Sequence, residues 1–256
     1  MISPLASIHP DARIGDQVEI GPFTTIGADV EVGNGSWIGP NVTIMEGARI
    51  GTDCRIFSGA VISAIPQDLK FQGESTTVEI GDRSTIRECV TINRGTKAYG
   101  KTVVGKDCLI MAYVHIAHDC IIGDHVILVN SVALAGHVEI GDYGIVSGLS
   151  AVHQFVKIGA HVMIGGGAMV RKDVPPFITA AGEPLAYAGV NSVGLKRRNF
   201  SQEDINEIQT LYRTLYQSGM NVSQAVNRIK EQYPNRPLAD LILSFIEQSD
   251  RGLIRK

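Results

Sequence analysis

The chain has 256 residues, of which 44% are hydrophobic, 6% aromatic and 19% charged, and its formal net charge is −3. This composition excludes a disordered chain, which would carry more charge and fewer aliphatic residues, and a collagen, which needs Gly at every third position. The charge gives no reason to expect a nucleic acid as partner. Because so few residues are aromatic, the composition predicts a narrow and repetitive aliphatic core.

No apolar run reaches the ~18 residues of a membrane-spanning helix. The first residues, 1–15, lack the basic and apolar regions of a secretory signal. The four cysteines form no Cys-x-x-Cys pair, so neither a disulfide framework nor a thiolate metal cage is expected. A reducing, cytoplasmic location fits this cysteine usage.

A six-residue repeat organises most of the chain. From Ile8 to Val170, every sixth residue is Ile, Leu or Val at 25 of 28 positions, and the next residue is often Gly. This period matches neither a helix nor a simple two-residue alternation. It predicts short strands joined by sharp turns, with three units closing each coil of a triangular prism. We expect the glycines to supply permissive backbone conformations at the corners.

Two segments interrupt the repeat, and a different period follows it. Residues 63–79 and 93–103 place polar or small residues at inward positions, so they are predicted to leave the prism as loops, which in solenoids often bind ligands. After Pro175-Pro176 and from Ser201 on, apolar residues recur at helical spacing in three segments. The predicted organisation is a β-helix over 1–190 and a C-terminal α-helical domain over 191–256. The latter is mildly basic, which fits either a solvated surface or an acidic partner.

The coil length predicts which side chains stack. Residues 18 apart should lie in adjacent coils, about 4.8 Å apart, which gives three columns: His118, Gly136 and Gln154; Asp119, His137 and Phe155; and His125, Tyr143 and His161. A histidine near its unperturbed pKa of ~6.5 accepts protons at neutral pH. A glycine N–H without a side chain over it can approach an oxyanion. The first column therefore predicts general-base catalysis.

The same histidines allow a metal site. Zinc takes three or four nitrogen or sulfur ligands, and a β-helical trimer could gather histidines across an interface, as the hexapeptide-repeat carbonic anhydrases do. Against this reading, Asp119 follows His118 and could orient it as a base. We therefore expect no metal and keep the carbonic anhydrase-like function as the less favoured alternative.

The hexapeptide pattern resembles the left-handed parallel β-helix of the hexapeptide-repeat transferases, and the handedness comes from this resemblance. Longer strings, in order along the whole chain, are similar to the UDP-N-acetylglucosamine O-acyltransferases of lipid A biosynthesis. These strings are Gln67-Asp68-Leu69-Lys70-Phe71, His115-Ile116-Ala117-His118-Asp119-Cys120, Leu134-Ala135-Gly136-His137-Val138, Ala151-Val152-His153-Gln154-Phe155, Gly194-Leu195-Lys196-Arg197-Arg198 and Arg251-Gly252-Leu253-Ile254-Arg255.

The resemblance implies transfer of an (R)-3-hydroxyacyl group from the phosphopantetheine of acyl carrier protein to the 3-hydroxyl of the glucosamine in UDP-N-acetylglucosamine. It makes His118 the general base, Asp119 its orienting partner and the Gly136 N–H an oxyanion donor. No further cofactor and no covalent acyl-enzyme are implied. Residues implied to bind the sugar, pyrophosphate and nucleotide are Asp68, Lys70, His115, His137, Gln154, Asn191, Arg197 and Arg198. The chain departs from the family at Asn93, where His is frequent, and at Val193, where Glu is frequent.

The resemblance also implies a homotrimer with sites between subunits and a groove for the acyl chain. The residues at the groove positions are Met111, Met163, Gly166 and Pro184. Because Gly166 leaves room and Pro184 is compact, we expect a long acyl chain, of about fourteen carbons or more. An acyltransferase acting on a related sugar nucleotide is the other alternative.

Overall fold

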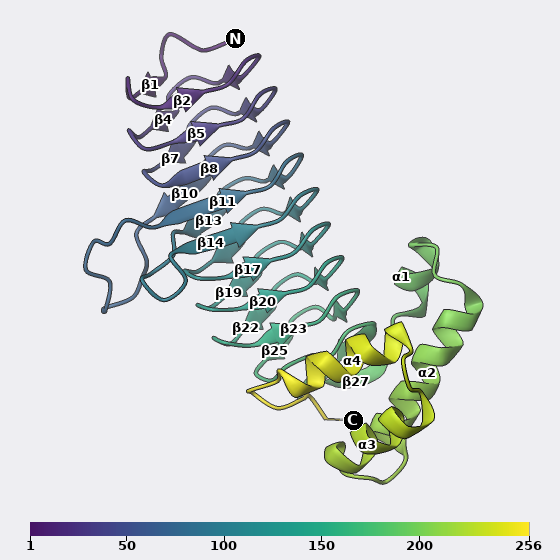
Figure 1. The fold of residues 1–256 in the computed structure, drawn as a ribbon. Coiled ribbons are helices and arrows are strands. Elements are labelled where there is room, and N and C mark those ends of the chain that lie inside the picture. Colours follow the sequence, from purple (N-terminus) through teal and green to yellow (C-terminus); the bar gives the residue numbers. More distant parts are fainter. Residues whose placement is uncertain (256) are drawn as a thin grey trace.

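Short parallel strands wind around one axis and form a prism with three walls, which ends in a group of helices (Figure 1). The computed structural model describes residues 1–255. The first wall has nine strands: β1 (Ser7–Ile8), β4 (Thr25–Ile26), β7 (Thr43–Ile44), β10 (Val61–Ala64), β13 (Thr91–Asn93), β16 (His115–Ile116), β19 (Ala133–Leu134), β22 (Ala151–Val152) and β25 (Met169–Val170).

The second wall has eight strands: β2 (Arg13–Ile14), β5 (Glu31–Val32), β8 (Ala48–Ile50), β11 (Thr77–Ile80), β14 (Lys101–Val104), β17 (Ile121–Ile122), β20 (Glu139–Ile140) and β23 (Lys157–Ile158). The third has ten: β3 (Glu19–Ile20), β6 (Trp37–Ile38), β9 (Arg55–Ile56), β12 (Thr85–Ile86), β15 (Leu109–Ile110), β18 (Ile127–Leu128), β21 (Ile145–Val146), β24 (Met163–Ile164), β26 (Ile178–Ala181) and β27 (Ala186–Val190). Among the strands of residues 1–255, only the last pair, β26 and β27, is antiparallel.

The strand register confirms the predicted 18-residue coil. Ser7 pairs with Thr25, and His115 pairs with Ala133. The register lengthens at two places, where Val61 pairs with Thr91 and Thr91 pairs with His115. The paired residues are 30 and 24 positions apart, which exceeds the 18-residue coil by 12 and 6 residues, or two repeats and one repeat. The six-residue frame therefore continues unbroken past both insertions.

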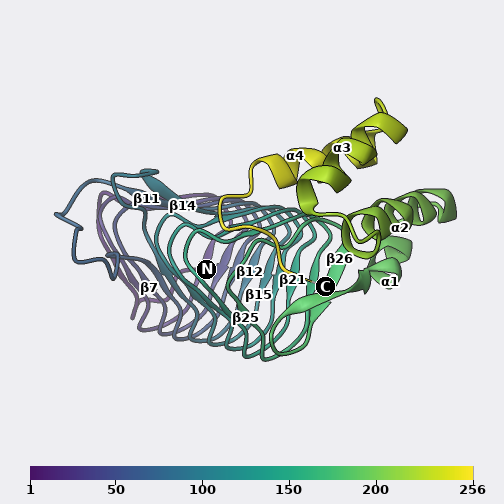
Figure 2. The same cartoon turned by 90° about the horizontal axis from the view of Figure 1, so that it is seen from below.

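The two insertions are shorter than the predicted loops. Strands extend to Ala64 and begin again at Thr77, and they extend to Asn93 and begin again at Lys101, so the connecting segments are 65–76 and 94–100. Both leave the prism on the same side (Figures 1 and 2). A hydrogen bond joins the two segments: the Thr76 hydroxyl donates to the Gly95 carbonyl at 2.6 Å.

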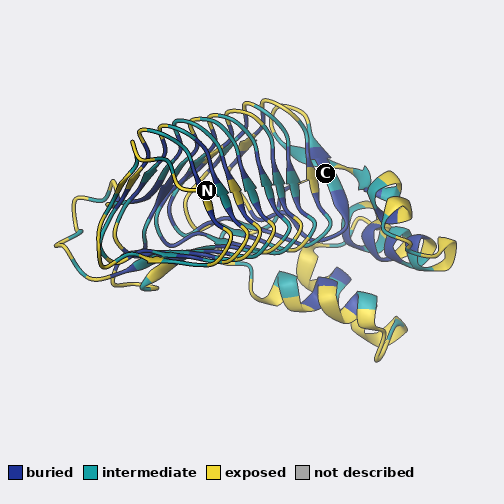
Figure 3. Cartoon of the chain, turned by 90° about the horizontal axis from the view of Figure 1, so that it is seen from above, coloured by how far each residue is buried: buried dark blue, intermediate teal, exposed yellow. Residues whose placement is uncertain are grey.

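The aliphatic column fills the prism. Most of its isoleucines, among them Ile38, Ile62 and Ile116, are fully buried, whereas Ile8 and Ile14 at the open first coil are partly buried. Figure 3 shows buried residues along the walls and exposed residues at the corners. The small positions of the repeat, such as Val42 and Cys54, are buried as well. An interior of this width accommodates branched aliphatic side chains, which explains the low aromatic content.

The repeated glycines serve a different purpose from the one expected. The positive φ angles at the corners belong mostly to other residues, such as Asn41 at 55° and Asp53 at 54°. The glycines instead allow successive coils to approach each other. A Cβ added to Gly33 would lie 2.5 Å from the carbonyl carbon of Gly51 in the next coil. Gly is therefore needed there for space rather than for backbone conformation.

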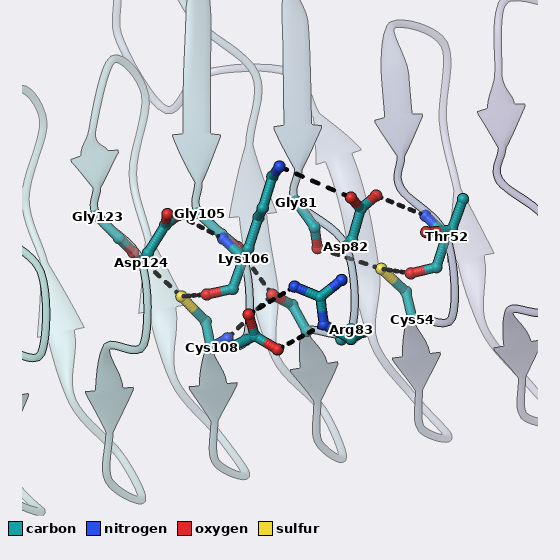
Figure 4. Close-up of polar contacts among 12 residues, drawn as sticks. Thr52, Cys54, Gly81, Asp82, Arg83, Gly105, Lys106, Cys108, Gly123 and Asp124 are labelled. Carbon is teal, nitrogen blue, oxygen red and sulfur yellow. Dashed lines mark hydrogen bonds and ion pairs between the residues drawn. The ribbon is translucent and has the colours of Figure 1, made fainter.

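Side chains at one corner link neighbouring coils (Figure 4). Asp82 accepts a hydrogen bond from the Thr52 N–H at 2.9 Å, and Asp124 accepts one from the Lys106 N–H at 2.8 Å. The bond from Thr52, opposed by partial desolvation, lowers the pKa of Asp82. Cys54 also links two coils at this corner, since its thiol donates to the Gly81 carbonyl at 3.3 Å.

Four helices follow the prism: α1 (Ser192–Arg197), α2 (Gln202–Gln217), α3 (Val222–Gln232) and α4 (Pro237–Glu247). The three longer helices match the segments predicted from helical spacing, whereas α1 was not predicted. Ser201 and Asn221 begin α2 and α3 with reciprocal capping bonds. The fully buried Tyr212 of α2 donates its hydroxyl to the Pro176 carbonyl at 2.5 Å and so attaches the helices to the last coil. No helix within residues 1–255 has the length and apolar content to cross a bilayer.

Candidate active site

His118 and Asp119 form a hydrogen-bonded pair at the corner between β16 and β17. His118 Nδ1 lies 2.7 Å from Asp119 Oδ2, and the two side chains are 15% and 0% exposed. An ionised carboxylate can only accept a hydrogen bond, so the proton of the neutral imidazole lies on Nδ1. The unprotonated Nε2 is then free to accept a proton from a substrate.

The Asp119 carboxylate is held by several donors. Oδ2 accepts from the Thr96 hydroxyl at 2.7 Å, and Oδ1 accepts from the N–H groups of Thr96 at 2.9 Å and Tyr99 at 3.3 Å. Burial alone would raise the pKa of Asp119, but the hydrogen bonds from His118 and Thr96 outweigh it and lower the pKa below its usual value. Asp119 is therefore ionised at neutral pH and holds the His118 tautomer.

Gly136 lies in the next coil, directly against the His118 ring. A Cβ added to Gly136 would lie 2.6 Å from Cε1 and 2.7 Å from Nε2 of His118. The backbone at Gly136 thus faces the basic nitrogen with no side chain between them. An N–H in this position can stabilise negative charge that develops on an atom reacting at Nε2.

His137 completes this group. Its Nε2 lies 3.7 Å from Asp119 Oδ2, and its ring stacks on Phe155 with centroids 4.5 Å apart. Burial is the main cause that lowers the pKa of His137; Asp119 and the loop residue Asp68 oppose this effect, and His118 adds to it. A neutral His137 therefore lies beside the dyad, and the influence of Asp68 shows that loop 65–76 reaches the same corner.

His115 and Gln154 lie near the same corner. His115 Nδ1 lies 2.8 Å from the Thr91 hydroxyl, and burial lowers the pKa of His115. Gln154 is exposed two coils beyond His118. The guanidinium of Arg251, in the C-terminal segment, donates to the Gln154 carbonyl at 2.9 and 3.2 Å and lies 2.9 Å from His153 Nδ1.

Three potential metal ligands lie together within residues 1–255: His118, Asp119 and His137, whose ligand atoms are all within 4.8 Å of one another. The 2.7 Å between His118 Nδ1 and Asp119 Oδ2 is a hydrogen-bond distance. Two ligands of one tetrahedral zinc at ~2.0 Å stand farther apart, at ~3.3 Å. Both oxygens of Asp119 are also occupied by protein donors. The arrangement fits a catalytic base better than a metal site.

Other predicted site residues lie at a different corner. Asn191 caps α1 by accepting from the Gly194 N–H at 3.2 Å, and its amide donates to the His161 carbonyl at 2.9 Å. Arg198 donates to the Tyr143 carbonyl at 3.0 Å. His125, Tyr143 and His161 stack there as predicted. The nucleotide contacts expected of Asn191 and Arg198 stay predictions, as does that of the exposed Arg197.

The residues predicted to line the acyl-chain groove lie on or near the third wall and the last coil. Met111 follows β15 and leads into the corner between the third and first walls, Met163 lies on β24, and Gly166 follows that strand. Pro184 lines a pocket of about 380 Å³ together with Met169 and residues of the C-terminal segment. Lys70 is exposed on loop 65–76. Within one chain, Met111, Met163 and Gly166 lie on or beside the third wall, away from the corner of His118.

Sequence reasoning missed Thr96 and Arg251. Thr96 lies within the second interruption of the repeat, and the hexapeptide frame says nothing about how such a loop folds. Arg251 lies in a string already noted as characteristic, Arg251-Gly252-Leu253-Ile254-Arg255, which was the available signal. The structure shows why the string matters, because this segment returns to the prism and pairs with Asp173 and Ala186.

The chain is similar to known proteins along its whole length. Residues 173–254 match the family model described as Udp N-acetylglucosamine O-acyltransferase; Domain 2, and residues 29–64 and 101–136 match the bacterial transferase hexapeptide (six repeats). An acyl-[acyl-carrier-protein]--UDP-N-acetylglucosamine O-acyltransferase from Janthinobacterium sp. (strain Marseille) is 48% identical over 260 residues, which cover 100% of this chain and 99% of that relative.

Solved structures extend the similarity over the whole fold. A UDP-N-acetylglucosamine acyltransferase from Bacteroides fragilis has a TM-score of 0.98 and 51% identity, with 100% of each chain covered. The Francisella novicida UDP-N-acetylglucosamine acyltransferase has a TM-score of 0.96 and 42% identity, with 100% of this chain and 94% of that chain covered. The predicted fold class, a left-handed parallel β-helix with a C-terminal helical part, is confirmed. The chain is an O-acyltransferase and belongs to the UDP-N-acetylglucosamine O-acyltransferase family.

Proposed function

We propose that this enzyme transfers an (R)-3-hydroxyacyl chain from acyl carrier protein to the 3-hydroxyl of the glucosamine in UDP-N-acetylglucosamine, as the first step of lipid A biosynthesis. The names of the relatives supply both substrates. The observation that carries the chemistry is the His118–Asp119 pair, whose free Nε2 faces the bare backbone of Gly136.

In the proposed reaction, His118 Nε2 takes the proton of the sugar 3-hydroxyl while that oxygen attacks the thioester carbonyl carbon. The new C–O bond places negative charge on the former carbonyl oxygen, which the Gly136 N–H stabilises. When the C–S bond breaks, the imidazolium returns its proton to the leaving phosphopantetheine sulfur. Asp119 holds the ring and stabilises the imidazolium throughout.

Direct transfer fits the state of the cysteines. Burial is the main cause that raises the pKa of Cys54 and Cys108 to about 11 and that of Cys120 to about 12. These thiols stay protonated at neutral pH, and the thiolate is the nucleophilic form. The exposed Cys89 lies in a different corner column from His118. We therefore propose no acyl-enzyme, and no cofactor beyond the phosphopantetheine of the donor.

The distribution of residues over the prism supports a homotrimer. His118 lies at the corner between the first and second walls, Asn191 and Arg198 lie against the corner between the second and third, and Met111 adjoins the corner between the third and first. One chain cannot bring three corners of a prism to a single substrate. Neighbouring copies of the prism would place different corners side by side, so we propose that each site lies between subunits.

The third wall offers a surface for an acyl chain. The outward residues of β15, β18, β21 and β24 are apolar and aligned in register: Leu109, Ile127, Ile145 and Met163. A Cβ added to Gly166 would meet only Gly148 and Ser147 atoms, at 3.5 and 3.9 Å, so the space beside it is open. We propose that this strip receives the acyl chain and favours lengths of about fourteen carbons or more.

The test is a product assay with purified protein, UDP-N-acetylglucosamine and (R)-3-hydroxyacyl carrier proteins of ten to sixteen carbons. We expect a 3-O-acylated product, the highest rate with fourteen or sixteen carbons, a trimer by light scattering and an unchanged rate after treatment with EDTA. A faster reaction with ten carbons would contradict the proposed chain length. A fully active monomer would contradict the shared site, and loss of acyl transfer on metal removal would contradict the metal-free mechanism. Since acyl carrier protein is a cytoplasmic donor, we propose a cytoplasmic location.

A further inference from the structure

The loop 94–100 folds tightly around the Asp119 carboxylate. Thr96 contributes both of its donors, the N–H to Oδ1 at 2.9 Å and the hydroxyl to Oδ2 at 2.7 Å, and is itself only 7% exposed. The loop is fixed in turn by the bond from Gly100 N–H to the Thr96 carbonyl at 2.7 Å. Thr96 therefore donates hydrogen bonds to both oxygens of a fully buried carboxylate from a hydrogen-bonded turn.

We propose that Thr96 is a positioning residue for the catalytic base, which fixes the Asp119 carboxylate so that Asp119 in turn fixes the His118 ring; this inference rests on the proposed role of His118. Thr96 contacts Asp119 rather than His118, so it acts through the carboxylate. The loop that interrupts the hexapeptide repeat thereby becomes part of the catalytic machinery.

The geometry of the carboxylate explains why a second support is needed. A terminal carboxylate rotates in a broad, nearly two-fold energy well, so the hydrogen bond to His118 alone does not fix its plane. The Thr96 hydroxyl on Oδ2 and the N–H groups of Thr96 and Tyr99 on Oδ1 add contacts to both oxygens, which together fix that plane. The backbone is held as well, since the Asp119 N–H donates to the Thr102 hydroxyl at 2.8 Å. A misplacement of about 1 Å at a reacting group can cost about a hundredfold in rate.

Thr96 also affects the negative charge on Asp119 that faces the His118 ring. The hydroxyl of Thr96 takes up part of the negative charge on Oδ2, the same oxygen that faces His118. Removing this donor leaves more of that charge to stabilise the imidazolium. Other titratable groups beside the pair are His137, directly, and Asp68 and Tyr99, which act on or pack against His137. All three remain in a Thr96 variant, so a change in His118 titration is attributable to the lost hydroxyl.

The experiment compares Thr96→Val, Thr96→Ser and wild type in the acyl-transfer assay and in an NMR titration of the His118 imidazole. We expect Thr96→Val to lower kcat by about tenfold to a hundredfold, with KM within about twofold. We also expect the acidic limb of the pH–rate profile and the His118 titration to move to higher pH. Thr96→Ser keeps the hydroxyl and should restore both. Thr96→Ala replaces the valine variant if the latter does not fold.

Thr24→Val is the matched control, because Thr24 is also buried and donates its hydroxyl to the Gly39 carbonyl at 2.7 Å in an early coil. It should lower thermal stability without changing kcat or the His118 titration. Wild-type kcat and titration in Thr96→Val would overturn the inference, and so would an equal loss of kcat in Thr24→Val. If wild type itself shows no acyl transfer, the proposed function fails, whereas the NMR titration still decides whether Thr96 controls His118.

Discussion

Gly136 and His118 form a matched pair across adjacent coils: a Cβ on Gly136 would lie 2.6 Å from His118 Cε1 and 2.7 Å from its Nε2. No ordinary side chain can occupy position 136 while the imidazole keeps its place beside Asp119. The basic nitrogen and the unobstructed backbone therefore depend on each other, and the 18-residue coil brings them together.

Gly136→Ala tests this dependence. The added methyl group must displace the imidazole, since real Cβ atoms do not approach other atoms at 2.6 Å. We expect kcat to fall by about a hundredfold while thermal stability stays close to that of wild type, because the displaced ring is partly exposed at a corner. An alanine variant with wild-type kcat would show that the close approach has no catalytic importance.

Arg251 provides a second test, remote in sequence. Its guanidinium holds the Gln154 carbonyl and lies 2.9 Å from His153 Nδ1, so it orients the turn that presents Gln154. We expect Arg251→Ala to raise the KM for the sugar nucleotide several-fold and to change kcat less. The control is Arg228→Ala, which removes an exposed arginine of α3. Equal effects of the two substitutions would argue against a role for Arg251 at the site.

His161 predicts a pH dependence of stability. Burial is the largest cause that lowers its pKa to about 4, the nearby Arg198 adds to the effect, and Asp142 opposes it. The unfolded chain binds this proton near pH 6.5 and the folded chain only near pH 4, so the stability present above pH 6.5 is lost as the pH falls through this window.

His161→Phe removes this proton while keeping a ring between Tyr143 and Phe177. We expect the variant to lose less free energy of unfolding than wild type between pH 7 and pH 5, by about 1 kcal/mol after allowance for solvent screening. His115 and His137 titrate in the same direction, so part of the acid sensitivity remains. Urea unfolding at both pH values measures the difference, and parallel curves for the two proteins would refute the assignment.

The column of His118, Gly136 and Gln154 could be predicted from the sequence because a β-helix has a fixed register. Once the period gives an 18-residue coil, His118, Gly136 and Gln154 must stack, and no knowledge of distant contacts is required. The insertions did not disturb this reasoning, since each adds a whole number of repeats. The purpose of the glycines was misjudged, because a six-residue pattern alone does not distinguish a corner conformation from close packing between coils.

Contacts outside the repeat could not be predicted in the same way. Thr96 reaches Asp119 through a loop whose fold depends on its own hydrogen bonds, and Arg251 reaches Gln154 from 97 residues away. The same holds for Asn191, which caps a helix and holds the His161 carbonyl. Such contacts have no period, so only the folded structure reveals them.

The most direct test of the central claim, that His118 is the general base, is the rate of product formation by His118→Ala with UDP-N-acetylglucosamine and a 3-hydroxyacyl carrier protein. The predicted result is a loss of about 10²–10⁴-fold in kcat relative to wild type, in a variant that remains folded. A His118→Ala enzyme with the wild-type rate would contradict the account and remove His118 from the mechanism.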